Sequence, residues 1–418
     1  MDYQLAKGVK LHIIPSSQFR LTNIVINFST LQTTSNATAR HLLANVLETS
    51  CQKYPTQTLL ARRLDALFGA VISANVARVG QIHTLRMRAQ VVNDQLARLP
   101  LLMPVINLLR EMIFQPLMGQ QGFDAATVDV QKKSLAGSLA AIHDDKQFVA
   151  YQRLAQLFYD QTSPMYYPSY GNSRDLEPLN GTNLLSTYRS LRDEDQVDIF
   201  VLGEVDAKKV RQAFAKWPFR DRQPLTVMAD YHQPFHHRLR QQLDRDHVEQ
   251  AKLDLAYHLP IYYRDPGYYP GLVMNGLLGG TPYSKLFLNV REKESLAYYA
   301  DSQLRAFSGH VVVETGISAN NYHRVRALID QQIQQLQDGK FTSEQLEEVK
   351  QSLITSYQVG LDNSLNIIEH RLVNELSGHP ELFDVPQAVA KVNREDVVAV
   401  AKQLRLQAVY YLGGDVDE

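Results

Sequence analysis

Two segments of the sequence resemble each other: IFVLGEVD at residues 199–206 and YYLGGDVD at residues 410–417. Each is an apolar run that reads as a buried strand and ends at a glycine. Their leucines, Leu202 and Leu412, lie about half of the 418-residue chain apart. A repeat of this length indicates duplicated domains rather than a solenoid of short units. The sequence therefore predicts two homologous halves.

The order of elements around these segments indicates the fold class. In the first half, alternating β-branched patterns over 9–14 and 23–28 predict a pair of strands. In the second half, strand patterns cover 251–258, 297–305 and 310–317. Helical patterns come in runs between the strands. This order favours an α+β fold, in which each half is a mostly antiparallel sheet covered by helices.

The same patterns predict the domain boundaries. We expect an N-terminal half over 1–221, a linker over 222–235 that contains Pro224 and Pro234, and a C-terminal half over 236–418.

Three longer stretches complete this outline. Helices are predicted over 96–114 and, without a break, over 123–157. The charged stretch 238–246 alternates in sign and is predicted to be a solvated face.

Composition limits the class of partner and the compartment. Lys and Arg total 43 and Asp and Glu total 44, so the net charge of -1 argues against nucleic acid or an acidic membrane as partner. The single cysteine, Cys51, suits a reducing compartment. No secretory signal pattern is visible, and the longest apolar stretch, 99–109, is too short to cross a bilayer. We expect a cytoplasmic protein.

One predicted helix carries a degraded metal motif. In an H-x-x-E-H helix, the two histidines share one face and bind a single zinc ion, while the glutamate acts as general base. Here the frame reads His41-Leu42-Leu43-Ala44-Asn45. The first histidine is present, but Ala44 replaces the glutamate and Asn45 replaces the second histidine.

A second motif lies in the other half, in the segment LFLNVREKESLAYY at 286–299. It holds Arg291 and, seven residues later, Tyr298. An arginine offers a rigid fork of donors to substrate carbonyls. A tyrosine hydroxyl can donate to an oxyanion that develops during hydrolysis.

Together, the early strand pair, the H-x-x-E-H frame, the Tyr-Pro-Thr at 54–56 and the second motif resemble the insulinase/pitrilysin-type (inverzincin) metallopeptidases over nearly the whole chain. The resemblance implies a duplicated α+β fold. It also implies a third ligand, a glutamate on a later helix, with an acidic residue seven positions before it. The matching positions are Ser138 and Gln131. In that family, the Arg and Tyr of the second half complete the active site from across a cavity.

These replacements have a chemical consequence. Ala44 cannot take a proton from water, and Asn45 and Ser138 are poor zinc ligands. We therefore expect no zinc in this chain and interpret His41 as a helix residue that is hydrogen-bonded locally.

The glycine pair before the second motif has another role. Gly279 and Gly280 do not fit a phosphate-binding loop, because the segment lacks the G-x-x-x-x-G-K pattern. They are predicted to end a helix with a left-handed cap. The family resemblance implies that they lie near the peptide-binding region.

The resemblance predicts a non-catalytic, peptide-binding subunit of a heterodimeric zinc metallopeptidase. Arg291 and Tyr298 would reach the zinc site of a partner, which is a related chain with an intact H-x-x-E-H motif or a second copy. The substrate would be an extended peptide. Two alternatives stay open: a structural or assembly protein of the same fold, and an active metallopeptidase with substitute ligands, such as His41 with Glu48.

Overall fold

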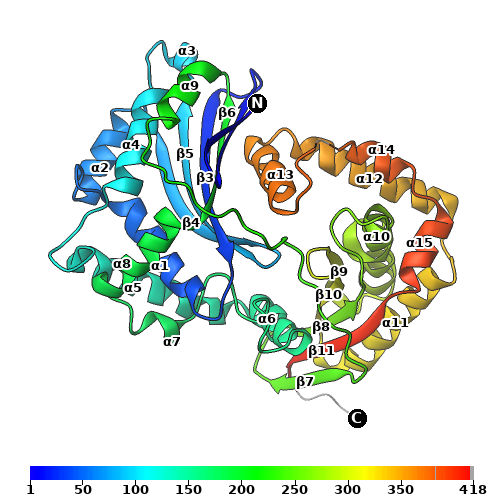
Figure 1. Ribbon diagram of the computed structural model, residues 1–418. Helices are drawn as coiled ribbons and strands as arrows, with labels where there is room; N and C mark the ends of the chain where they lie inside the picture. Colours follow the sequence, from blue (N-terminus) through cyan, green and yellow to red (C-terminus); the bar gives the residue numbers. More distant parts are fainter. Residues whose placement is uncertain (382, 415–418) are drawn as a thin grey trace. The chain divides into compact units, whose positions relative to one another are not determined.

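The computed structural model describes residues 1–381 and 383–414, which form two compact units (Figure 1). The first unit holds Met1–Ala141, Tyr167–Ala229 and Asn363–His379. The second holds Ile142–Tyr166, Asp230–Asp362 and the described residues from Pro380 onward. Each unit is a sheet covered by helices, so the predicted α+β class is confirmed.

The first unit is built on a six-stranded sheet. Strands β2 and β6 are parallel, and all other neighbours are antiparallel. The first of the two matching sequence segments forms β6 in the middle of the sheet. In sheet order, the strands are β1 (Asp2–Ala6), β2 (Val9–Pro15), β6 (Gln196–Gly203), β3 (Leu21–Leu31), β5 (Ile82–Val92) and β4 (Val71–Val79).

Helices cover both faces of this sheet. The side chain of His83 on β5 contacts Arg40 of α1, whereas Arg86 on the same strand contacts Glu369 of α13. Residues three apart on a strand point to opposite faces, so α1 and α13 lie on opposite faces. The helices are α1 (Asn36–Thr49), α2 (Gln57–Asp65), α3 (Asp94–Ala97), α4 (Leu102–Phe114), α5 (Ala125–Ala141), α7 (Ser173–Leu176), α8 (Gly181–Asp193), α9 (Ala207–Phe214) and α13 (Ser364–Leu376).

The second unit is built on a five-stranded sheet. Strands β7 and β11 are parallel, and the other neighbours are antiparallel. The second matching segment begins in β11, and its residues 415–417 lie outside the described residues. In sheet order, the strands are β7 (Arg240–Arg245), β11 (Arg405–Gly413), β8 (Ala251–His258), β10 (His310–Ile317) and β9 (Ala297–Arg305).

The helices of the second unit also cover two faces. Leu253 and Leu255 pack with Ile329 of α11, while Ala256 on the alternate face packs with Leu154 of α6. The short segments η1 and η4 are 3₁₀-helical, and η2 and η3 are π-helical. The helices are η1 (Ile142–Asp144), α6 (Lys146–Phe158), α10 (Tyr268–Asn275), η2 (Gly276–Gly280), η3 (Leu286–Lys293), η4 (Ala319–Asn321), α11 (Tyr322–Gln337), α12 (Ser343–Gly360), α14 (Val385–Ala390) and α15 (Arg394–Ala401).

The two sheets share one topology. Without β1, the order β2-β6-β3-β5-β4 of the first sheet corresponds to β7-β11-β8-β10-β9 of the second. Each unit also takes one helix from the sequence of the other half, because α6 belongs to the second unit and α13 to the first. No single cut in the sequence separates the two units. The predicted boundaries of 1–221, 222–235 and 236–418 therefore stay a prediction about the sequence halves.

Two predicted helices need correction. The helix predicted over 123–157 is interrupted, because the Asp145 side chain accepts from the Phe148 backbone N–H and starts α6 as a new helix. The helix predicted over 96–114 is also interrupted, since Arg98 has a left-handed φ of 54°. The charged stretch 238–246 is exposed or partly exposed, as predicted, but it also contains the edge strand β7, which the charge pattern did not indicate.

The described residues contain no helix that is both long and apolar enough to cross a membrane.

Candidate functional site

The degraded motif lies on α1, which a buried arginine fixes against the first sheet. Arg40 donates to Asp195 Oδ2 at 2.6 Å, to His83 Nδ1 at 3.0 Å and to the Phe28 carbonyl at 2.7 Å. Burial, followed by the nearby Arg40 charge, lowers the pKa of His83 to about 3. His83 is therefore neutral at physiological pH, and its Nδ1 can accept the hydrogen bond that Arg40 donates. Arg40 thus fixes the position of the next residue on α1, His41.

His41 itself is partly buried. Its Nδ1 donates to the Tyr170 carbonyl at 2.9 Å. Zinc-binding histidines usually have a hydrogen bond of this kind, which leaves Nε2 to face the metal. Ala44 is fully buried, and Asn45 is partly buried on the same helix. The helix therefore keeps one oriented imidazole without the base and without the second ligand.

The two positions matched to the third ligand lie on α5, which packs against α1. Gln131 is buried, whereas Ser138 is exposed, and its hydroxyl donates to the Ser134 carbonyl of its own helix at 3.2 Å. A serine that is engaged in this way offers no charge to a cation. Within residues 1–381 and 383–414, no group of three His, Cys, Asp or Glu side chains at metal-binding distances includes His41.

Glu48, the substitute ligand considered for His41, has a different contact. Its Oε2 accepts from the Ala74 backbone N–H on edge strand β4 at 2.8 Å. The second unit has a comparable arrangement. Asn275 at the end of α10 donates to the Ser302 carbonyl on edge strand β9 at 3.2 Å and accepts from the Ser302 hydroxyl at 2.8 Å. Each edge strand is thus anchored by a polar side chain of a helix earlier in its unit, α1 for β4 and α10 for β9.

The start of each edge strand repeats as well. Phe68 and Ser295 both have a left-handed backbone, with φ of 61° and 52°. Three residues later, Val71 and Tyr298 are 55% and 57% exposed. Tyr298 therefore occupies in the second unit the place that Val71 occupies in the first. Sequence reasoning missed this correspondence, because the two segments share few residue types.

Arg291 and Tyr298 are both accessible in the second unit. Arg291 is exposed on η3, where its guanidinium lies 4.8 Å from the centre of the Phe287 ring and 3.7 Å from Glu292. Tyr298 lies in a bulge of β9, because Ala297 pairs with Ile317 and Tyr299 pairs with Gly316. A bulge redirects a side chain relative to the regular strand. Strand β9 packs against η3, so the structure brings the elements of both residues together.

The glycine pair belongs to the π-helical turn η2. Neither glycine has a positive φ, so the predicted left-handed cap is wrong. Their role is close packing. A Cβ on Gly279 would lie 2.5 Å from the Ser302 backbone nitrogen, and one on Gly280 would lie 2.6 Å from Asn275 Nδ2. Gly279 therefore lets η2 approach the backbone of edge strand β9.

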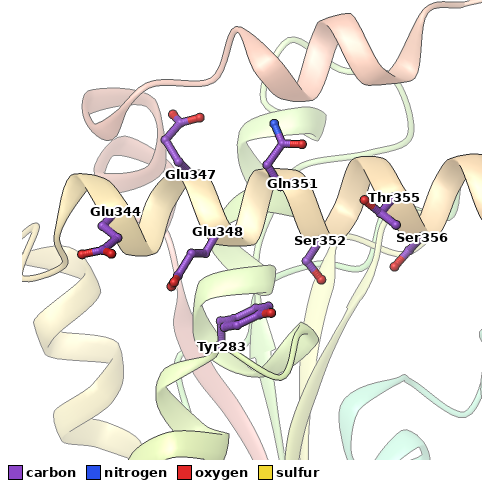
Figure 2. A pocket seen from close by; sticks show the side chains of 8 residues that line it. All are labelled: Tyr283, Glu344, Glu347, Glu348, Gln351, Ser352, Thr355 and Ser356. Carbon is purple, nitrogen blue, oxygen red and sulfur yellow. The ribbon is translucent and has the colours of Figure 1, made fainter.

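An open groove of about 610 Å³ runs along α12, and Tyr283 also lines it. Figure 2 shows that Glu348 and Ser352 project from α12 on the side where Tyr283 lies. The groove carries three glutamates, one of which, Glu347, is paired with Lys350 at 2.8 Å. The lining residues are Tyr283, Glu344, Glu347, Glu348, Gln351, Ser352, Thr355 and Ser356.

Comparisons with known proteins agree with this picture. Residues 178–353 match the family described as "Peptidase M16 inactive domain". The chain belongs to the peptidase M16 family. The resemblance to insulinase/pitrilysin-type peptidases is thereby confirmed, and the matched region corresponds to the inactive domain of this family.

Relatives cover the full length of this M16 chain. A Bacillus subtilis protein named "Probable inactive metalloprotease YmfF" is 28% identical over 411 residues, which are 97% of this chain and 96% of that protein. The crystal structure of a conserved protein from Enterococcus faecalis V583 is 34% identical, with a TM-score of 0.94 over 100% of this chain and 99% of that chain. An M16 inactive domain from Pseudomonas fluorescens, at 16% identity and a TM-score of 0.76 over 100% and 99%, shows the same fold.

Proposed function

We propose that this chain is the non-catalytic, peptide-binding subunit of a heterodimeric zinc metallopeptidase. One contrast carries the proposal. The second unit keeps an exposed Arg291 beside a strand that presents Tyr298, while the motif helix of the first unit keeps only His41. In a chain with no part in peptide hydrolysis, accessible side chains of Arg291 and Tyr298 would serve no catalytic purpose.

The edge strands support binding of an extended peptide. Within the described residues, β4 pairs only with β5, and β9 pairs only with β10. An extended peptide can add to such an edge through its main chain and place alternate side chains in neighbouring pockets. Beside β4, the exposed Phe68 and Val71 offer apolar surface. Glu48 takes up only the Ala74 N–H of that edge.

The chemistry of the retained pair supports a role in trans. The Arg291 guanidinium can bind substrate carbonyls through two donors at once. The Tyr298 hydroxyl can donate to the oxyanion that forms when a zinc-bound water attacks the scissile carbonyl. Zinc and the general base would come from the partner. A second copy of this chain would lack them too, so we favour a related chain with an intact H-x-x-E-H motif.

We also propose that the chain is cytoplasmic. Cys51 is buried and is the single cysteine of the chain, and a chain without disulfides suits a reducing environment such as the cytoplasm.

Reconstitution tests the proposal. The zinc content of the purified chain is compared with that of its His41→Ala variant, which reports on zinc at α1. Peptide cleavage is assayed for the chain alone and then for its mixture with a related chain that carries H-x-x-E-H. We expect no stoichiometric zinc at α1 and no cleavage by the chain alone, but cleavage by the mixture. Arg291→Ala should reduce turnover of the mixture at least tenfold. Arg324→Ala, which alters another exposed arginine paired with Glu294, serves as matched control and should leave turnover unchanged.

The same experiment separates the alternatives. Cleavage by the lone chain, lost in His41→Ala, would favour substitute ligands and contradict the proposal. A stable complex with no turnover under any pairing would favour a structural or assembly protein of the same fold.

A further inference from the structure

A cluster of one imidazole and three carboxylates lies in the first unit, and all of its members except Asp2 are largely buried. His12 on β2 stands between Asp2 on β1, at 2.8 Å from Nδ1, and Asp198 on β6, at 3.3 Å from Nε2. Glu375 on α13 approaches from the helix side. His12 is 1% exposed, Asp198 is fully buried, and the Glu375 side chain is 5% exposed.

The spacing of the cluster fits one metal ion. One ligand atom each from His12, Asp198 and Glu375 all lie within 4.8 Å of one another. A zinc ion binds nitrogen and oxygen ligands at about 2.0–2.2 Å, so the ligand atoms around it lie roughly 3 to 4.2 Å apart. Small side-chain rotations therefore suffice to bring all three atoms onto one ion.

The surroundings orient these ligands. Asp2 accepts from His12 Nδ1, which makes Nε2 the nitrogen that faces the cluster centre. Gln196 donates to Asp198 Oδ2 at 2.9 Å and leaves Oδ1 on the side of His12. Histidines and carboxylates that bind metals commonly have outer hydrogen bonds of this type.

Basic side chains border the cluster. Lys10 lies 2.8 Å from Glu375, and Arg371 lies 3.1 Å from Asp2. The Lys10 side chain is half exposed and can turn to solvent, which would leave the Glu375 carboxylate free to bind a cation.

We propose that His12, Asp198 and Glu375 bind one divalent transition-metal ion, with water completing its coordination. A set of one imidazole and two carboxylates suits Zn²⁺, whereas Mg²⁺ prefers oxygen ligands in octahedral geometry. The ion would join β2 and β6 to α13, a helix that comes from a distant part of the sequence. The site would thus stabilise the attachment of α13 to the first sheet. Its role is structural and does not depend on the proposed subunit function.

Titration of the full chain tests the site. Chelator-treated protein is titrated with ZnCl₂ by calorimetry, and its thermal unfolding is followed with and without zinc. We expect one saturable equivalent and a higher unfolding temperature. Glu375→Gln should weaken this binding at least tenfold. Asp2→Asn, which removes the positioning hydrogen bond from His12, should weaken it about 10–100-fold.

A matched control lies on the same helix. Glu369 pairs with Arg86 at 2.6 Å and has no imidazole beside it. Glu369→Gln makes the same change of charge on α13 and should leave zinc affinity within twofold of wild type. Because Asp2 is half exposed, Asp2→Asn keeps the test decisive if Glu375→Gln fails to fold.

Three results would overturn the proposal: no saturable zinc binding by the wild type, unchanged affinity in both Glu375→Gln and Asp2→Asn, or an equal effect of MgCl₂. The first two would identify the cluster as a closed network of ion pairs, and the third would show that the chain has no site selective for transition metals.

Discussion

His41 keeps the orientation of a zinc ligand, because Nδ1 donates to the Tyr170 carbonyl. Its neighbours Ala44 and Asn45 supply neither a base nor a second strong ligand. The residue types alone predict that the general base and the second ligand are missing. They do not predict the orientation of the imidazole, because it depends on a loop about 130 residues further along the chain. The same limit hid the His12 cluster, whose members come from β2, β6 and α13.

A single buried acid makes the stability of the second unit depend on pH. Asp254 on β8 is fully buried and lies opposite Glu314 on β10. Burial, and then the Glu314 charge, raise the pKa of Asp254 well above its usual range. The folded state therefore binds a proton more tightly than the unfolded state. This contribution to stability is complete below the ordinary value of 3.8 and is lost as pH rises through the folded pKa.

Asp254→Asn should remove that pH dependence. The amide keeps the shape of the protonated acid, and Gln147, which contacts Asp254 Oδ2, can still pair with it. Denaturant unfolding between pH 5 and 9 measures the effect. We expect the wild type to lose stability relative to the variant as pH rises. Parallel curves for the two proteins would show that Asp254 ionises normally.

Gly279 should tolerate no side chain. A Cβ there would lie 2.5 Å from the Ser302 backbone nitrogen, which cannot move without disturbing β9. Gly279→Ala should lower the free energy of unfolding by about 1–3 kcal/mol, as expected for overpacking. Gly137 on α5 is the control, because a Cβ there meets nothing within 4 Å. Gly137→Ala should instead stabilise the chain by roughly 0.5–1 kcal/mol. Thermal unfolding of both variants checks the contrast, and equal effects would contradict it.

At the scale of elements, the two edge strands are the surfaces on which the proposed peptide binding depends. Glu48 holds β4 through the Ala74 N–H, and Asn275 holds β9 through Ser302. These anchors keep each edge in place while most of its main chain stays available for pairing. A left-handed residue precedes each edge strand, and the side chain three residues after it is exposed. The repeat is therefore clearer in conformation than in sequence.

Glu48→Ala should loosen β4. The Ala74 N–H loses a charged acceptor, and hydrogen bonds to charged groups contribute about 1.5–3 kcal/mol. We expect lower stability of the first unit and faster amide hydrogen exchange at Ala74. Glu48→Gln keeps a side-chain oxygen and should retain much of the protection. Unchanged exchange at Ala74 in the alanine variant would mean that the contact does not hold the strand.

Patterning predicted most strands, because short runs of β-branched residues such as those of β3 and β10 leave few alternatives. It failed at the break between α5 and α6, where Asp145 starts a new helix inside a continuous helical pattern. It also failed at β7, where charged residues conceal an edge strand. The sequence also does not indicate that η2 and η3 are π-helical, since no local pattern distinguishes a π-helix from an α-helix.

At the scale of the whole molecule, the duplication was visible in the sequence but the exchange of helices was not. The apolar stripe on α6 predicts that the helix is buried, yet it cannot tell which sheet buries it. Leu154 packs with Ala256 of the second sheet, and α13 reciprocally packs on β3 and β6 of the first. Such pairings join residues far apart in the chain. The same reason limits prediction of the site. The sequence motif identifies Arg291 and Tyr298, but it does not predict the bulge that presents Tyr298, because the bulge depends on the pairing of β9 with β10.

The kinetics of Tyr298→Phe in the reconstituted pair test the central claim most directly. If the hydroxyl of this chain donates to the oxyanion in the partner's zinc site, its removal should lower kcat roughly 100-fold and leave KM nearly unchanged. Tyr283→Phe, which removes another exposed hydroxyl of the same unit, should leave both constants unchanged. A kcat for Tyr298→Phe within twofold of wild type, in a complex that cleaves peptide, would contradict the account.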